Sequence, residues 1–117
     1  MDRPTHRELN RKLYQAKRAV SKKAILIINP AALAEDAHEL GYLISDLADI
    51  LSEILNEITP QNYIGRHPPE KSYEEEIKDL DLFTFRWDSV RFGCETYLKF
   101  VISGDFLYIV SLHQHRP

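Results

Sequence analysis

Three stretches near the end of the chain carry ionisable side chains at alternating positions. Arg86 and Asp88 alternate in the first, Tyr97 and Lys99 in the second, and His113 follows the third. Imidazole accepts and donates protons near neutral pH, and a fixed cation stabilises charge that develops in a transition state. Such a set is suited to metal-independent RNA cleavage. A base takes the 2′-hydroxyl proton, a cation holds the phosphorane oxygens, and an acid protonates the leaving 5′-oxygen.

These side chains meet only if the three stretches are strands of one sheet. Residues 82–88, 95–102 and 106–112 alternate in polarity, and residues 103–105 predict a turn. Successive strand residues point to opposite faces, so the apolar set takes the face covered by helices and the polar set takes the open face. A polar open face is also ordinary for an antiparallel sheet, so a merely solvated surface is the alternative.

The length of the last turn decides whether His113 joins the polar face. A three-residue turn places His113 on the same face as Tyr97, whereas a two-residue turn moves it to the opposite face. The longer turn keeps the aromatic rings of Phe106 and Tyr108 with the core. We therefore predict the three-residue turn.

Residues 5–20 predict a surface helix. Thr5 and Glu8 form a capping-box pattern at its start, and apolar residues recur at helical spacing in a narrow stripe. Residues 1–23 contain eight Lys or Arg and two acids. Outward cations are typical of a solvated helix face, and a contact with an acidic partner or a phosphate backbone is the alternative.

The middle of the chain predicts a buried strand over residues 24–28 and a helix over residues 31–40. The strongest helical pattern covers residues 46–57, with Ser45 as N-cap and its acids facing solvent. Residues 24–60 contain seven acids and no Lys or Arg. The formal net charge of −3 is therefore an average over a basic N-terminus and an acidic middle.

Residues 59–71 predict a proline-containing loop, and Ser72 with Glu75 predicts the start of a short helix over residues 73–79. Helices followed by a three-strand meander predict an α+β fold, with N-terminal helices packed on one face of a C-terminal antiparallel sheet. At 117 residues, the chain has the length of a single domain.

Composition excludes several classes of protein. The longest apolar run has five residues, far below the about 20 that span a bilayer. The single cysteine, Cys94, cannot form an internal disulfide, which favours a reducing, cytoplasmic compartment. An isoelectric point near 5.9 argues against a generic duplex-DNA binder. His113 and His115 have no carboxylate or cysteine beside them in sequence, so we expect no metal and no other cofactor.

Five short segments carry a resemblance to a known family through their order and spacing. They are Ala32-Leu33 with Glu39-Leu40-Gly41, the helix over residues 46–58 followed by Tyr63, Trp87-Asp88-Ser89-Val90, Thr96-Tyr97-Leu98-Lys99-Phe100, and Leu107-Tyr108-Ile109-Val110-Ser111-Leu112. Over about residues 15–112 the chain resembles the MqsR family of bacterial toxins.

Members of that family are ribonucleases, called mRNA interferases, with a RelE-like α+β fold and a DNA-binding antitoxin. The resemblance implies that residues 1–117 form one toxin-like domain of a type II toxin–antitoxin system. It implies a cytoplasmic endoribonuclease that acts on RNA without a metal and is blocked by a cognate antitoxin protein. It implies no membrane association and no direct DNA binding by the toxin alone.

Matching positions carry the family's site over residue by residue. The active-site tyrosine of the family matches Tyr97, and a C-terminal lysine falls on His113, which retains the ability to transfer a proton. The glutamine after the tryptophan falls on Asp88. There an anion would act as a base or would form an ion pair with Arg86 or Arg91.

The family's lysine after the loop tyrosine has no counterpart, because Ile64 follows Tyr63. Arg66 or His67 could supply that charge, and His67 is the second candidate for proton transfer. The expected catalytic residues are Tyr97, Lys99, His113, Arg86, Asp88 and His67, and the expected RNA-binding residues are Arg66, Arg91, Arg116 and Lys99.

Two other functions remain open on the sequence alone. A non-catalytic protein-interaction domain would use the uneven charge to bind an oppositely charged partner. The second is an RNA-binding module that does not cleave RNA, which is intermediate between the protein-interaction domain and the ribonuclease. We expect Trp87 in the core rather than as a platform for bases, because it shares the phase of Phe83 and Phe85.

Overall fold

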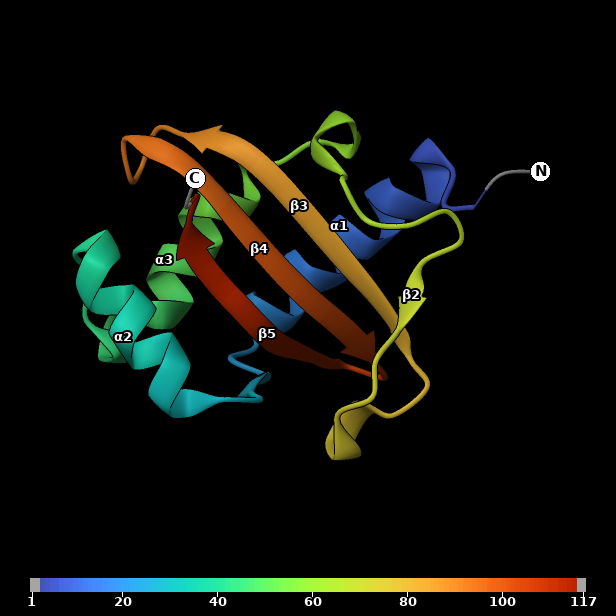
Figure 1. Cartoon of the computed structure of the whole chain (residues 1–117), viewed down its shortest axis with the longest axis horizontal. Coiled ribbons are helices and arrows are strands. Elements are labelled where there is room, and N and C mark those ends of the chain that lie inside the picture. Colours follow the sequence, from blue (N-terminus) through green and yellow to red (C-terminus); the bar gives the residue numbers. More distant parts are fainter. Residues whose placement is uncertain (1–2, 116–117) are drawn as a thin grey trace.

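Five strands form one mixed sheet in the computed structural model, which describes residues 3–115 (Figure 1). Across the sheet the order is β1 (Ile25–Ile27), β5 (Phe106–Gln114), β4 (Cys94–Ser103), β3 (Asp81–Ser89) and β2 (Glu70–Lys71). β1 runs parallel to β5, and all other pairs are antiparallel. The predicted meander is confirmed, with a short strand added at each edge.

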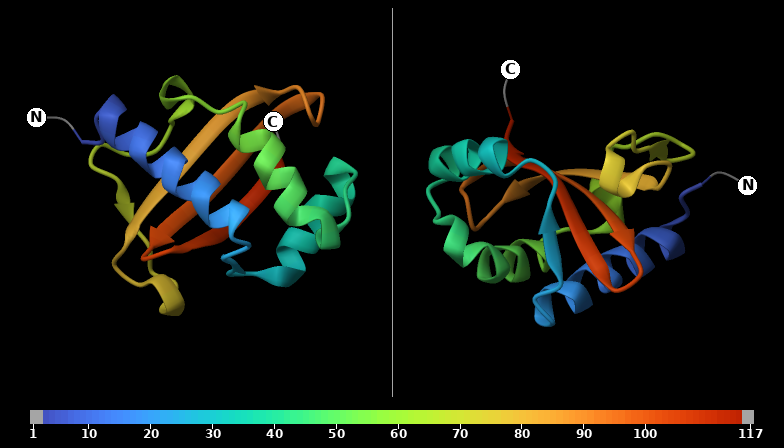
Figure 2. Two further views of the ribbon diagram at one scale, coloured as in Figure 1. Left: turned by 180° about the vertical axis from the view of Figure 1, so that it is seen from behind. Right: turned by 90° about the horizontal axis from the view of Figure 1, so that it is seen from below.

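Helices cover one face of this sheet, as predicted. α1 (His6–Ser21) and α3 (Leu47–Leu55) lie side by side across the back face (Figure 2, left). α2 (Pro30–Leu40) packs against β5 near the β1 edge. The core lies between the helices and the sheet, and its largest fully buried side chains include Phe83, Phe85, Phe100, Leu51, Ile54 and Leu55. The α+β fold class is therefore confirmed.

The predicted strand over residues 24–28 is shorter and less buried than expected. β1 occupies the edge of the sheet, where Leu26 is exposed. An edge strand buries fewer side chains than a central one because it has a neighbour on one side only. The expectation of a buried strand was wrong.

The turn between β4 and β5 is one residue shorter than predicted. Gly104 and Asp105 form it, Ser103 lies opposite Phe106, and Gly104 has the positive φ that a tight hairpin needs. Leu107 consequently enters the core, while Phe106 is 45% exposed. The three-residue turn, with Phe106 in the core, was wrong.

A β-bulge in the same hairpin reverses the effect of the shorter turn. Between Lys99 and Phe100 the pairing register with β5 shifts by one residue. β5 has one residue more than β4 at this point, and such an extra residue moves every later side chain of its strand to the other face. His113 therefore lies opposite Tyr97, as predicted, although a bulge rather than the turn produces that placement.

The face away from the helices is only partly open. Residues 72–80 fold over one end of it, and Ile77 is buried there with Leu82 and Val101. Tyr108 packs against this second cluster rather than in the main core. The segment contains a single 3-10 turn, η3 (Glu75–Ile77), so the predicted helix over residues 73–79 was wrong.

The predicted N-caps differ in outcome. Thr5 caps α1 by accepting a hydrogen bond from the Glu8 amide at 3.1 Å, but the Glu8 carboxylate binds Arg3 instead of returning to the cap. Ser45 does not cap α3, because it lies inside a 3-10 turn, η1 (Ile44–Asp46), that precedes the helix. Gly41 ends α2 in the left-handed conformation, with a φ of 82°.

Glu57 fastens the end of the α3 segment to the β3–β4 turn. Its carboxylate accepts hydrogen bonds from Trp87 Nε1 at 2.8 Å, Ser89 Oγ at 2.8 Å and the Arg91 amide at 2.9 Å. Trp87 is 5% exposed and belongs to the core, as predicted. The expectation that all acids of this helix face solvent was wrong for Glu57.

Candidate active site on the sheet face

Polar side chains fill the part of the front face that residues 72–80 leave open. Cross-strand pairing arranges them in rows, and strand geometry sets neighbouring rows about 7 Å apart. The His115 amide donates to the Glu95 carbonyl at 2.8 Å and so extends the last row. Read from β3 through β4 to β5, the rows are Thr84–Lys99–Ser111, Arg86–Tyr97–His113 and Asp88–Glu95–His115.

The Tyr97 hydroxyl is the centre of this face. Arg86 Nη1 donates to it at 3.2 Å, and His115 Nδ1 lies 3.1 Å from it. The rings of His113 and His115 both stack against the Tyr97 ring, with centroids 5.3 and 5.6 Å away. We call these four residues, with Glu95, the Tyr97 cluster. It brings a phenol, a guanidinium and two imidazoles together.

Hydrogen-bond donors and acceptors in the Tyr97 cluster form a directed chain. Because the Tyr97 oxygen accepts from Arg86, its own proton can be donated to His115 Nδ1. His113 Nδ1 lies 2.9 Å from the Gln114 carbonyl oxygen, which can only accept. In the neutral His113 ring, the proton therefore resides on Nδ1, and Nε2 keeps a free lone pair.

Glu95 holds the two ends of this chain in place. Its Oε1 forms an ion pair with Arg86 Nε at 3.2 Å and lies 3.8 Å from His115 Nδ1. The hydrogen bond to Tyr97, the electrostatic interaction with the Tyr97 oxygen and the Glu95 carboxylate raise the pKa of Arg86 further above its ordinary value. Arg86 is thus a cation at neutral pH.

Asp88 makes neither of the two predicted ion pairs. Arg86 binds Glu95, and Arg91 Nε lies 3.0 Å from the Glu53 carboxylate on the helix side of the sheet. Asp88 is exposed and lines a shallow polar hollow beside Arg86. The structure therefore leaves Asp88 beside the Tyr97 cluster and takes Arg91 away from it.

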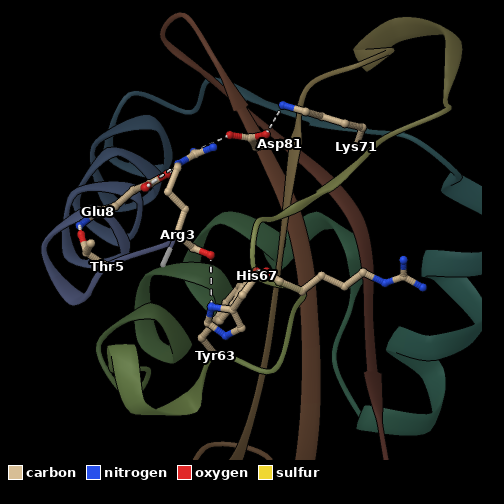
Figure 3. Close-up of polar contacts among 8 residues, drawn as sticks. Arg3, Thr5, Glu8, Tyr63, His67, Lys71 and Asp81 are labelled. Carbon is tan, nitrogen blue, oxygen red and sulfur yellow. Dashed lines mark hydrogen bonds and ion pairs between the residues drawn. The ribbon is translucent and has the colours of Figure 1, made fainter. Parts of the chain in front are cut away.

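Arg66 and His67 also lie away from the Tyr97 cluster. His67 Nδ1 is 3.1 Å from the Arg3 carbonyl oxygen, and the His67 ring meets Tyr63 edge-on at 5.3 Å (Figure 3). Tyr63 in turn packs on Phe85 in the core, which sets this group at the β3 edge on the helix side. Arg66 is 82% exposed in its side chain. Arg116 lies outside the described residues.

Among residues 3–115, no three His, Cys, Asp or Glu side chains gather in a set that could hold a metal ion. No helix in the same range is both long enough and apolar enough to cross a membrane. The sequence matches no protein-family model and no curated protein. The similarity to the MqsR family therefore stays a prediction.

His115 and Glu95 are the members of the Tyr97 cluster that were not predicted from the sequence. In the sequence, His115 stands out only as half of a metal-binding pair with His113. The two-residue spacing of these histidines was a usable signal, because it puts both rings on one face of an extended strand. Their stacking on Tyr97 depends on the register of β4 against β5, which the spacing does not contain.

A network of charges ties the N-terminal segment to β3 near His67. Asp81 accepts from Arg3 Nη2 at 2.9 Å and also from Lys71, while Arg3 forms a two-pronged pair with Glu8 (Figure 3). Partial burial works to raise the pKa of Asp81, but the hydrogen bonds from Lys71 and Arg3 outweigh it and lower that pKa.

Removing the Asp81 charge should weaken this attachment. We expect Asp81→Asn to lower the free energy of unfolding by about 1 kcal/mol, because its cationic partners are largely exposed. The measurement is urea denaturation in low salt and again in 0.5 M NaCl, where screening should shrink the difference. Asp79→Asn, in an exposed loop, is the matched control and should change little. Equal stability of Asp81→Asn and wild type in low salt would contradict the assignment.

Proposed function

We propose that this protein is an endoribonuclease that cleaves RNA by acid–base catalysis on the open sheet face. One observation carries the proposal: the Tyr97 hydroxyl lies between Arg86 and His115, while His113 stacks on the Tyr97 ring. On the strength of the family resemblance, we also propose that it is the cytoplasmic toxin of a type II system. A cognate antitoxin protein would then block this face.

The groups of the Tyr97 cluster suffice for the chemistry. His113 Nε2, with its free lone pair, takes the proton of the 2′-hydroxyl as the 2′-oxygen attacks the adjacent phosphorus. Arg86 faces the negative charge of the phosphorane. The 5′-oxygen leaves with a proton from protonated His115, and a 2′,3′-cyclic phosphate remains.

Tyr97 and Lys99 position the RNA substrate. In the protonated His115 ring, Nδ1 donates to the Tyr97 oxygen, so the proton on Nε2 is the one that faces the leaving group. Lys99 lies one row away, about 7 Å, which suits a contact with the phosphate of a neighbouring nucleotide. Both residues place substrate against the two imidazoles.

Product chemistry tests this proposal. Purified protein with a mixed-sequence single-stranded RNA and EDTA should yield fragments that end in a 2′,3′-cyclic phosphate and begin with a 5′-hydroxyl. Tyr73→Phe alters an exposed tyrosine that is not part of the Tyr97 cluster, and it should cleave like wild type. Intact RNA combined with normal growth of expressing cells would overturn the ribonuclease proposal. RNA that is bound but not cut would instead indicate a binding module.

A further inference from the structure

Helix α1 presents a line of cations to solvent. Arg7, Arg11, Arg18 and Lys22 lie three to four residues from their neighbours in the line, with Tyr14 in the middle. This spacing returns each side chain to one side of a helix, over about 22 Å. The buried residues of α1 occupy the opposite side. We call these five residues the cation row.

The cations of this row make no ion pair within the part of the chain that the structure describes. Among residues 3–115, the ion pairs engage other cations, and none includes Arg7, Arg11, Arg18 or Lys22. Tyr14 is 62% exposed, although an aromatic side chain gains free energy when it is covered. A row of unpaired cations around an exposed aromatic ring is the pattern of a single-stranded nucleic-acid platform.

A hollow of about 320 Å³ lies beside Tyr14. Four residues of the cation row, all except Arg7, line one side of it, and the Gly104-Asp105 turn lines the other. Gln15 also lines this hollow, and its Oε1 is buried without a hydrogen-bond partner in the protein. Leaving a buried acceptor unpaired is costly, so a ligand group that donates a hydrogen bond would be stabilised there.

We propose that the cation row and this hollow bind single-stranded RNA. Arg11, Arg18 and Lys22 contact phosphates, and a base stacks on Tyr14 with its polar edge directed at Gln15 and Asp105. An acidic peptide fits less well, because it would leave the exposed Tyr14 ring without a stacking partner. Duplex RNA fits less well because its bases are already stacked inside the helix.

This second contact is separate from the proposed cleavage site. α1 covers the back of the sheet (Figure 2, left), and the pairing of β3, β4 and β5 places the Tyr97 cluster on the opposite face. The proposal concerns binding alone, so it does not rest on catalysis. If both proposals hold, the α1 surface anchors a part of the RNA that the sheet face does not cut.

The proposal is tested by fluorescence anisotropy with a labelled oligonucleotide of fifteen 2′-O-methyl-uridine nucleotides. This probe lacks the attacking 2′-hydroxyl, so the wild-type protein cannot cleave it by the proposed route. The double variant Arg11→Gln/Arg18→Gln should weaken binding at least about tenfold. Because it loses two phosphate contacts, the slope of log affinity against log salt concentration should become shallower by about 1.4. Tyr14→Ala should weaken binding about tenfold through lost stacking. Lys17→Gln with Lys23→Gln removes the same charge outside the cation row and should change affinity less than about twofold.

Three results would overturn the proposal. The first is equal loss of affinity in the Lys17/Lys23 control, and the second is equal binding of duplex RNA with no effect of Tyr14→Ala. The third is binding of a 15-residue polyglutamate through the cation row without binding of the RNA probe. Wild-type binding that depends on the cation row, without any RNA cleavage, would refute the sheet-face ribonuclease alone. Cleavage with no effect of the cation row on binding would refute the α1 proposal alone.

Discussion

Tyr97→Ala combined with His113→Ala is expected to lower the rate of RNA cleavage by at least about 10³-fold. The double variant removes the proposed base and the ring on which it stacks, and it frees His115 from its hydroxyl partner. The measurement is the initial rate on a fluorogenic single-stranded RNA. Circular dichroism should show an unchanged fold, because both side chains lie on the exposed face rather than in the core.

A matched control uses the same residue types elsewhere. Tyr73→Ala with His38→Ala changes two exposed side chains outside the Tyr97 cluster and should leave the rate unchanged. The single variants separate the roles: a general base and a general acid each produce one limb of a bell-shaped pH–rate profile. His113→Ala should remove the limb at low pH, and His115→Ala the limb at high pH. Cleavage that survives the Tyr97/His113 double variant would show that the active site lies elsewhere.

Glu57→Ala should destabilise the protein by about 3 kcal/mol in urea denaturation. The substitution leaves Trp87 Nε1 and Ser89 Oγ, two groups of buried residues, without the acceptor that binds both. It also releases the Arg91 amide in the β3–β4 turn. Glu53→Ala is the control, because the Glu53–Arg91 pair is exposed and should contribute less than about 1 kcal/mol. A loss no larger than that of Glu53→Ala would contradict the anchoring role.

The contribution of Glu57 should also depend on pH. Partial burial works to raise its pKa, but hydrogen bonds from Trp87, Arg91, Ser89 and Val90 prevail and lower it from the ordinary value of 4.5. The folded state thus binds the proton more weakly than the unfolded state. The stabilisation should be complete above about pH 5 and should fade as the pH drops through the lowered pKa. Denaturation of wild type and Glu57→Gln at pH 7 and pH 3 should show a smaller difference at pH 3.

The face of the sheet on which each side chain of β3 and β4 lies could be predicted from the sequence, because the alternation of side chains along a strand is a local property. Arg86, Tyr97 and Lys99 alternate with apolar residues, so burying the apolar set leaves the polar set on the other face. Trp87 follows the same reasoning, and its burial was predicted correctly. The helices were likewise predictable from apolar spacing, since the burial of one helix side is encoded every three to four residues.

Other features depend on contacts between distant parts of the chain. Glu57 turns inward because Trp87 and Ser89, more than 25 residues later, present donors to it. His67 was expected near the site, but Tyr63 and Arg3 hold it on the other side of the β3 edge. No local pattern contains these pairings, because they form only when the segments pack together.

The sequence by itself determined which groups the last three strands offer: a guanidinium, a phenol and an ammonium on one face of β3 and β4, and imidazoles at the end of the chain. Only the tertiary structure decided which of them touch. The short Gly104-Asp105 turn alone would have sent His113 to the helix side, and the bulge beside Phe100 restored it. A register is set by the packing of whole strands against the core, so a single residue gained or lost in pairing outweighs any local preference.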